Sequence, residues 1–239
     1  MFDSHSPQTL DETSYRLDGN FTLNPLASLV IQSFFDALAL KHKLSAEILS
    51  MDGMSGRKYR YFINSLVSNI ENPSYIEVGS WMGSTACAAI YGNSLTITCI
   101  DNWSQFGGPK KEFIENISKN LNPNVVFKFI EDDFRKLDFS QLGTLFNIYL
   151  FDGPHEERDQ YDGIVIAQPA LTETYILIVD DWNWPEVRNG TLKALADLKS
   201  TTVCSIEIQT NQYNNHPKVS HKESEWHNGY FFAVIQKAL

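Results

Sequence analysis

Apolar residues recur every three or four positions in the first third of the chain, after an opening polar stretch. Residues 1–23 are polar and show no period, which is typical of an N-terminal tail. Asn24 and Pro25 supply a helix N-cap and a proline at the first helical position, and the apolar period after them predicts a helix to about residue 43. Similar patterns predict helices over 45–51 and 57–70, so three helices are expected before any strand.

From residue 74 onward, short apolar runs alternate with amphipathic segments. The runs that predict strands are 75–79, 95–101, 125–133, 146–153, 175–181, 203–210 and 230–236. The segments that predict helices are 84–91, 110–121, 156–170 and 186–198, with a short turn near 138–142. This rhythm is typical of right-handed crossovers and of a parallel sheet with helices on both faces. Residues 211–228 are polar and carry no helical pattern, so the last two strands are expected to form an antiparallel hairpin.

Composition narrows the classes of protein that fit this pattern. The 239 residues suit one sizeable domain with an appendage, and the 43% of apolar residues suffice for a core. The 19 basic and 29 acidic residues give a net charge of −10, which opposes binding to nucleic acid. An acidic, polar N-terminus and the lack of a long apolar run predict neither a signal peptide nor a membrane helix. Three widely spaced cysteines, at positions 87, 99 and 204, argue against a disulfide framework and favour a reducing compartment, the cytoplasm.

Glycines and an acid follow the first two predicted strands. Gly79 and Gly83 lie in a strand-to-helix turn, where backbone can approach a ligand closely and helix N–H groups favour an anion. Asp101 ends the second strand, where a carboxylate can accept hydrogen bonds from ribose hydroxyls. The two features together indicate a nucleoside site, although each alone also fits a tight turn or a solvated acid. The G-x-x-x-G spacing differs from the G-x-G-x-x-G fingerprint of dinucleotide sites.

Acids also end the fourth and fifth predicted strands. Asp152 precedes Gly-Pro-His155, and Asp180 and Asp181 follow an apolar run. Three carboxylates at adjacent strand ends suit Mg²⁺ or a similar divalent ion, although Asp152 or Asp181 could instead cap the next helix. His155 lies three residues after Asp152 and could act as a general base or serve in packing and hydrogen bonding.

Five motifs occur in this order: EVGSWMGST, CIDNW, FIEDDF, LFDGPH and IVDDWN. Together they resemble the class I S-adenosylmethionine-dependent methyltransferases. The resemblance is to the metal-dependent small-molecule O-methyltransferases of the macrocin and mycinamicin sugar type, with catechol O-methyltransferase as a more distant relative. It covers roughly residues 52–239. It implies an α/β fold with a Rossmann-like seven-stranded, mostly parallel sheet in the order 3-2-1-4-5-7-6, the last strand antiparallel. It further implies a methyltransferase domain over 73–239, preceded by a helical extension or lid over 24–72.

The resemblance also implies roles for individual residues. Gly79, Gly83 and Ser84 would hold the methionine part of S-adenosylmethionine with Glu77 beneath it, and Asp101 would bind the ribose. Asp133, or its neighbour Asp132, would lie near the adenine. The residues expected to bind the cofactor are Glu77, Gly79, Ser80, Gly83, Ser84, Asp101, Asn102, Trp103, Asp132, Asp133 and Asp152. Asp152, Asp180 and Asp181 match the metal ligands, and His155 matches the base of the sugar enzymes.

The expected activity is therefore Mg²⁺-dependent transfer of a methyl group from S-adenosylmethionine to a hydroxyl of a small molecule, a sugar or glycosylated metabolite. Nucleic acid and membranes are not expected partners. A nicotinamide-dependent oxidoreductase, a non-catalytic nucleoside-binding relative and an iron-dependent hydroxylase-like relative remain alternatives, although the all-carboxylate triad favours Mg²⁺ over iron. The segments 102–108 and 211–228 match nothing that names an acceptor. The apolar faces of 26–40 and 59–70 fit either a lid or the interface of a homo-oligomer.

Overall fold

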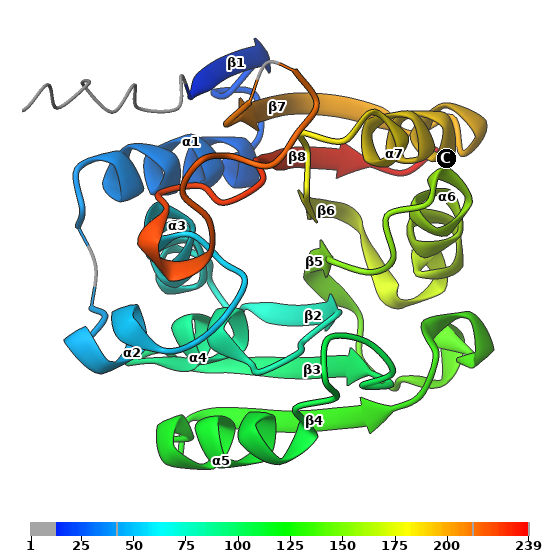
Figure 1. Cartoon of the computed structure of the whole chain (residues 1–239). Coiled ribbons are helices and arrows are strands. Elements are labelled where there is room, and N and C mark those ends of the chain that lie inside the picture. The colour runs from blue at the N-terminus through cyan, green and yellow to red at the C-terminus, as the bar shows by residue number, and fades with distance from the viewer. Residues whose placement is uncertain (1–12, 42, 212, 239) are drawn as a thin grey trace, which may run out of the picture.

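The computed structural model describes residues 13–41, 43–211 and 213–238, and it places one mixed sheet at the centre of the chain (Figure 1). The strands of this sheet are β1 (Ser14–Gly19), β2 (Ser74–Val78), β3 (Leu95–Asp101), β4 (Val125–Glu131), β5 (Phe146–Phe151), β6 (Leu171–Asp180), β7 (Thr201–Gln209) and β8 (Tyr230–Gln236). Their order across the sheet is β1-β7-β8-β6-β5-β2-β3-β4. Strands β2 to β6 run parallel, and β8 lies antiparallel between β6 and β7. The fold is therefore the Rossmann-like α/β architecture, and strands β2 to β8 follow the expected order and hairpin.

The expectation of seven strands is wrong, because an eighth strand lies within the segment interpreted as a tail. Strand β1 pairs antiparallel with β7 along the edge of the sheet, from Ser14 opposite Gln209 to Gly19 opposite Cys204. All six residues of β1 are exposed. An edge strand exposed on both faces needs little apolar patterning, and the short alternation at Tyr15 and Leu17 is the only sequence signal. Residues 1–12 of the expected tail lie outside the described residues.

The helices follow the expected segments closely. They are α1 (Pro25–Leu38), α2 (Ala46–Ser50), α3 (Arg57–Asn69), α4 (Ser84–Ile90), α5 (Lys110–Asn120), α6 (Glu157–Ile166) and α7 (Pro185–Asp197). Short 3₁₀ turns are η1 (Phe134–Lys136), η2 (Phe139–Gln141), η3 (Gln168–Ala170) and η4 (His221–Glu223). The Asn24 side chain accepts a hydrogen bond from the Leu26 N–H at 2.8 Å, as the sequence predicted for the start of α1. Helix α1 ends five residues before the expected position, and α6 gives way to η3 where Pro169 follows.

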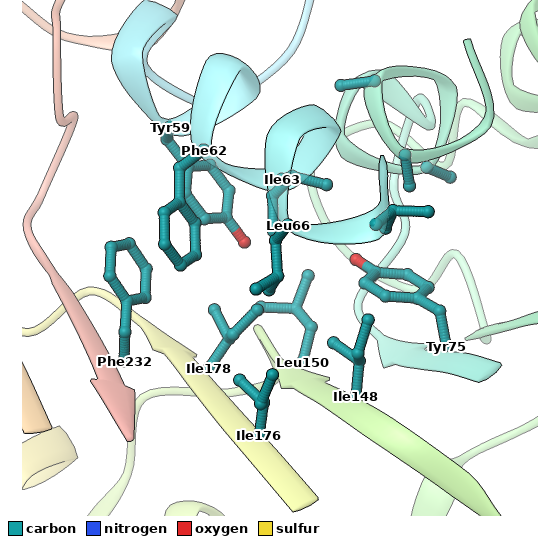
Figure 2. Close-up of a cluster of buried hydrophobic side chains, with 14 of the residues drawn as sticks. Tyr59, Phe62, Ile63, Leu66, Tyr75, Ile148, Leu150, Ile176, Ile178 and Phe232 are labelled. Atoms are coloured by element: carbon teal, nitrogen blue, oxygen red, sulfur yellow. The ribbon is translucent and has the colours of Figure 1, made fainter. Parts of the chain in front are cut away.

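Two layers of helices cover the sheet. Helices α1, α3, α4 and α5 pack on one face, and α6 and α7 pack on the other (Figure 1). Figure 2 shows side chains of α3 directed at the strands. Tyr59 stacks on Tyr230 with 3.8 Å between ring centroids, and Phe62 stacks on Phe232 at 3.9 Å. All four rings are buried, so α3 belongs to the core and packs against the start of β8.

Two further findings bear on the expectations from composition. Among the described residues, no helix combines the length and the apolar character needed to cross a bilayer. Cys87, Cys99 and Cys204 are buried free thiols.

Candidate active site

A cavity of about 720 Å³ lies beyond the carboxyl ends of β2, β3, β5 and β6, and the loop between β7 and β8 closes part of it. In an open α/β sheet this is the usual place for a ligand. Acids and histidines dominate the polar part of its wall: Asp101, Asp132, Asp133, Asp152, His155, Glu156, Asp159, Asp180, Asp181, His216, His221 and His227. Apolar and aromatic wall residues include Met54, Val78, Trp81, Ile100, Phe106 and Phe134.

The turn between β2 and α4 brings backbone to the cavity wall. Gly79 has φ +91°, and a Cβ there would lie 1.8 Å from the carbonyl oxygen of Asp152. Only glycine fits this position, because any side chain would collide with the neighbouring strand. Gly83 has φ +79° directly before α4, and a Cβ there would lie 2.9 Å from the ring of Phe113. These two contacts explain both glycines of the G-x-x-x-G spacing.

The remaining predicted residues of this turn lie behind the wall. Gly79 lines the cavity, whereas Glu77, Ser80, Gly83 and Ser84 are absent from its lining. The Ser84 and Ser55 hydroxyls are 2.9 Å apart, and Tyr75 donates a 2.7 Å hydrogen bond to Glu77. Burial raises the pKa of the Glu77 carboxyl. These four residues therefore lie outside the lining of the cavity in the part of the chain that the structure describes.

Asp101 ties together the loops that follow β2 and β3. Its carboxylate accepts the Trp81 N–H at 2.7 Å and the Trp103 N–H at 2.6 Å. The Trp103 indole donates to the Trp81 carbonyl at 2.9 Å, so the two loops are joined twice. Trp103 packs on Phe113 and does not line the cavity, whereas Asn102 does. Trp81, which sequence reasoning missed, forms part of the wall and could have been found from its place inside the glycine turn.

The loop after β4 contributes two neighbouring acids. Asp132 and Asp133 both line the cavity. Asp133 caps η1 by accepting the Arg135 N–H at 3.0 Å, and it also pairs with the Arg135 guanidinium at 3.2 Å. Asp132 accepts the N–H of Asp133 at 2.8 Å and has no cationic partner in the described part of the chain. Asp132 is therefore the acid of this pair with more capacity to bind a ligand.

Three carboxyls meet at the ends of β5 and β6, as the sequence predicted. Asp180 is 4% exposed and Asp181 is 5% exposed, and Asp152 lies beside them. Burial, and then the charges of the neighbouring acids, raise the pKa of both Asp152 and Asp180 well above the usual range. A hydrogen bond between the two carboxyls raises the pKa of Asp180 and lowers that of Asp152, so a proton held on Asp180 relieves part of their repulsion. Such a crowded acid group is one that a divalent cation would stabilise.

His155 lies in the same group. Its Nε2 is 2.6 Å from the Asp181 carboxylate. Burial alone would lower the pKa of His155, but the hydrogen bond to Asp181 and the charges of Asp181 and Asp152 raise it to about 9. Burial alone would raise the pKa of Asp181, but the hydrogen bond and the charge of His155 lower that pKa below its usual value. One ligand atom from each of Asp152, His155 and Asp181 lies within 4.8 Å of the other two. Asp180 is not part of that set, so in the described residues His155 takes the place that the sequence assigned to Asp180.

The loop of residues 211–228 adds side chains that sequence reasoning could not place. The Asn228 amide donates a 2.6 Å hydrogen bond to Asp181, on the carboxylate oxygen that His155 leaves free. His216, His221 and His227 line the cavity from this loop. Burial lowers the pKa of His227 to about 4. The only signal for these residues in the sequence was the abundance of Asn and His between two strands.

Comparisons with known proteins agree with this geometry. Residues 76–182, from β2 to just after β6, match the family described as "Methyltransferase domain". No curated protein matches the chain in sequence. Among solved structures, a candidate SAM-dependent methyltransferase from Streptococcus mutans has a TM-score of 0.52 at 15% identity, covering 75% of this chain and 48% of its own. The chain thus spans about half the length of that protein.

Two other solved structures are covered almost completely. A protein from Corynebacterium glutamicum has a TM-score of 0.52 at 13% identity, with 89% of this chain and 90% of that chain covered. The O-methyltransferase TomG from Streptomyces achromogenes, involved in tomaymycin synthesis and solved with SAM, has a TM-score of 0.50 at 11% identity and the same coverage. At these identities the structures establish the fold alone. Residues 76–182 carry the match to a methyltransferase domain, within the part of the chain that forms the sheet.

Proposed function

We propose that this protein is an S-adenosylmethionine- and Mg²⁺-dependent O-methyltransferase that acts on a hydroxyl of a small molecule, a sugar or a glycosylated metabolite. The observation that carries the proposal is the juxtaposition within one cavity of two sites. Gly79 and Asp101 form a nucleoside-type site at the ends of β2 and β3, and Asp152, His155 and Asp181 form a group of metal-ligand type at the ends of β5 and β6.

The cofactor half of the cavity lies at the ends of β2, β3 and β4. We assign the ribose to Asp101, whose oxygens each accept one backbone N–H and keep a second lone pair for a hydroxyl. Asp132 lies where it can accept from the adenine amino group, and Asn102 forms the adjoining wall. Gly79 allows the methionine part close to the strand ends. Glu77, Ser80, Gly83, Ser84 and Trp103 support this half from behind, and Asp133 holds η1.

The metal half consists of Asp152, Asp180 and Asp181, with His155 as an alternative to Asp180 in the ligand set. Hard carboxylate oxygens suit Mg²⁺, and the crowding that raises the pKa of Asp152 and Asp180 is what a cation would relieve. When bound, such a cation lowers the pKa of a hydroxyl and orients it toward the methyl donor. Asn228 fixes one oxygen of Asp181 and thereby its direction.

His155 is the proposed general base. A base must be neutral with a free nitrogen, whereas His155 without a cation donates to Asp181 and its pKa is about 9. Nε2 can therefore accept a proton from the acceptor hydroxyl only after the bond to Asp181 is given up. Any ligand that takes up the charge of Asp181 would lower the pKa of His155 toward neutrality, where a base works best.

The remaining walls fit a small acceptor. Met54 comes from the segment between α2 and α3, and Ser220 comes from the β7–β8 loop. Lys222 of that loop donates at 2.5 Å to Asp52, which lies two residues before Met54, so the two segments form one wall. We propose that residues 24–72 contribute a wall of the acceptor cavity to the domain over 73–239. The acidic wall and the net charge of −10 disfavour a nucleic-acid acceptor.

Calorimetry and a methyl-transfer assay test the proposal together. We expect S-adenosylhomocysteine, but not NAD, to bind the full chain. We then expect a panel of methyl glycosides and diphenols to yield a product heavier by one methyl group with Mg²⁺ and none with EDTA. Asp152→Asn should abolish the Mg²⁺-dependent turnover, with S-adenosylhomocysteine affinity changed by less than about three-fold. Equal turnover in EDTA would defeat the metal part, and loss of cofactor binding in Asp152→Asn would show that the two halves are not separate.

A further inference from the structure

The loop between β7 and β8 is fixed in place at several points. The N–H groups of Arg57 and Lys58, at the start of α3, donate to the carbonyls of Ser224 and Glu225 at 2.8 and 2.9 Å. On the other side, Trp226 is buried and donates from its indole to the Tyr15 hydroxyl of β1 at 2.9 Å. The residues that follow Trp226 therefore have a defined position at the cavity.

His227 has a defined tautomer as well as a defined position. Its Nδ1 accepts the backbone N–H of His221 at 2.9 Å, so the neutral ring carries its proton on Nε2. His227 is 6% exposed and lines the cavity, and its bond from His221 uses only Nδ1, which leaves the Nε2–H as the donor of the ring. Burial keeps the ring neutral around pH 7, although Asp181, His216, His221 and His155 are close enough to act on it electrostatically.

His227 also lies next to the group that the proposed function places at the reaction centre. Asn228, the next residue, bonds to Asp181, whose other oxygen is bonded to His155. An acceptor hydroxyl near His155 therefore has the wall formed by His227 beside it. A neutral ring with one N–H donor suits an uncharged oxygen and offers nothing to an ammonium group.

We propose that His227 is an acceptor-binding residue: its Nε2–H donates to an ether or hydroxyl oxygen of the methyl acceptor, adjacent to the hydroxyl that is methylated. This inference rests on the proposed function. The inference goes beyond the proposed function because it names a specificity-determining contact and restricts the acceptor to molecules with an oxygen beside the nucleophile.

Kinetics with matched variants test the contact. The probes are methyl glycosides and their monodeoxy analogues, used with the full chain, Mg²⁺ and S-adenosylmethionine. His227→Phe should raise the acceptor KM about ten-fold, the usual cost of one hydrogen bond, and His227→Gln should restore part of the loss because its amide can donate. Removal of one particular hydroxyl should raise KM about ten-fold in the wild type and have no effect in His227→Phe.

Glu223→Gln is the matched control, since Glu223 lies in the same η4 turn as His221, is exposed and does not line the cavity. Its KM should be close to that of the wild type, and the affinity for S-adenosylhomocysteine should be unchanged in all variants. An unchanged KM in His227→Phe would overturn the proposal. A parallel loss of S-adenosylhomocysteine affinity would do the same, because it would show a structural role.

A spectroscopic arm needs no acceptor. ¹⁵N NMR of histidine-labelled protein, assigned by comparison with His227→Gln, should show a neutral His227 ring protonated at Nε2 between pH 6 and 8. A proton on Nδ1, or a cationic ring, would overturn the proposal. If the wild type methylates none of the glycosides or diphenols, the proposed function fails first and this inference falls with it.

Discussion

Replacing Asp180 with asparagine should stabilise the protein without metal and weaken its response to Mg²⁺. Asparagine has the shape of a protonated aspartate, and its amide can donate to Asp152 as the neutral Asp180 carboxyl does. Two unit charges about 4 Å apart repel by about 4 kcal/mol at an effective dielectric constant of 20. The folded protein avoids part of this cost by holding a proton, so we expect a gain of about 2 kcal/mol for Asp180→Asn at pH 8 in EDTA.

The sign of the pH dependence follows from the raised pKa of Asp180. Below the ordinary aspartate pKa, near 4, the Asp180 carboxyl is protonated in both the folded and the unfolded chain and does not change the free energy of unfolding. As the pH rises toward the higher pKa of the folded state, the unfolded chain ionises first and the wild type loses stability. The advantage of Asp180→Asn should therefore be absent at pH 4 and grow toward pH 8.

Thermal unfolding in EDTA and in Mg²⁺ measures this effect. A gain of about 2 kcal/mol corresponds to an increase in Tm of roughly 5 °C for a chain of this length. Asp197→Asn removes the same charge from an exposed pair with Lys193 and should change Tm by less than about 1 °C. Mg²⁺ should raise the Tm of the wild type more than that of Asp180→Asn. A lower Tm for Asp180→Asn in EDTA, or equal stabilisation of both proteins by Mg²⁺, would refute the reasoning.

Three further predictions concern the turn, the core and the histidine of the site. Gly79→Ala should lower the free energy of unfolding by about 3 kcal/mol or more, because its Cβ collides with Asp152. Gly107 also has a positive φ but has nothing within 4 Å of an added Cβ, so Gly107→Ala should lower it by only about 1 kcal/mol. Equal losses for the two variants in urea denaturation would contradict the collision. Phe62→Ala should lower the free energy of unfolding by about 3–5 kcal/mol, since its fully buried ring is stacked in the core, and a calorimetric loss below about 1 kcal/mol would contradict that packing. In EDTA, the stabilisation from the pairing of His155 with Asp181 should be fully present below about pH 6.5, the ordinary histidine pKa, and lost as the pH rises through about 9. His155→Gln should therefore lower Tm at pH 6 and not at pH 10. Equal decreases in Tm at both pH values would contradict the pairing.

The local sequence was sufficient to predict most of the elements. The period of apolar residues and the cap at Asn24 were enough to place α1 and α2, because these signals depend on residues only a few positions apart. Gly79 and Gly83 could be singled out as turn glycines, since a positive φ is a local requirement. Strand β1 was missed because an exposed edge strand is selected by its partner β7 and leaves little pattern of its own.

The site was only partly open to sequence reasoning. Parallel strands end at one edge of a sheet, so the positions of Asp101, Asp152 and Asp181 at the ends of predicted strands were enough to expect them together. Whether His155 bonds to Asp181, and whether Ser84 faces a ligand or Ser55, depends on distances between segments far apart in the chain.

The sequence by itself therefore determined the order of the helices and of strands β2 to β8, the glycine turn and the acids at the strand ends, because each follows from short-range pattern and from the common direction of parallel strands. Only the tertiary structure decided which groups share the cavity with them. The loop of residues 211–228 has no period, and its histidines reach the wall because α3 and β1 hold the loop there through contacts between residues as far apart as Tyr15 and Trp226. Such contacts depend on packing and on long-range hydrogen bonds, and no local pattern encodes them.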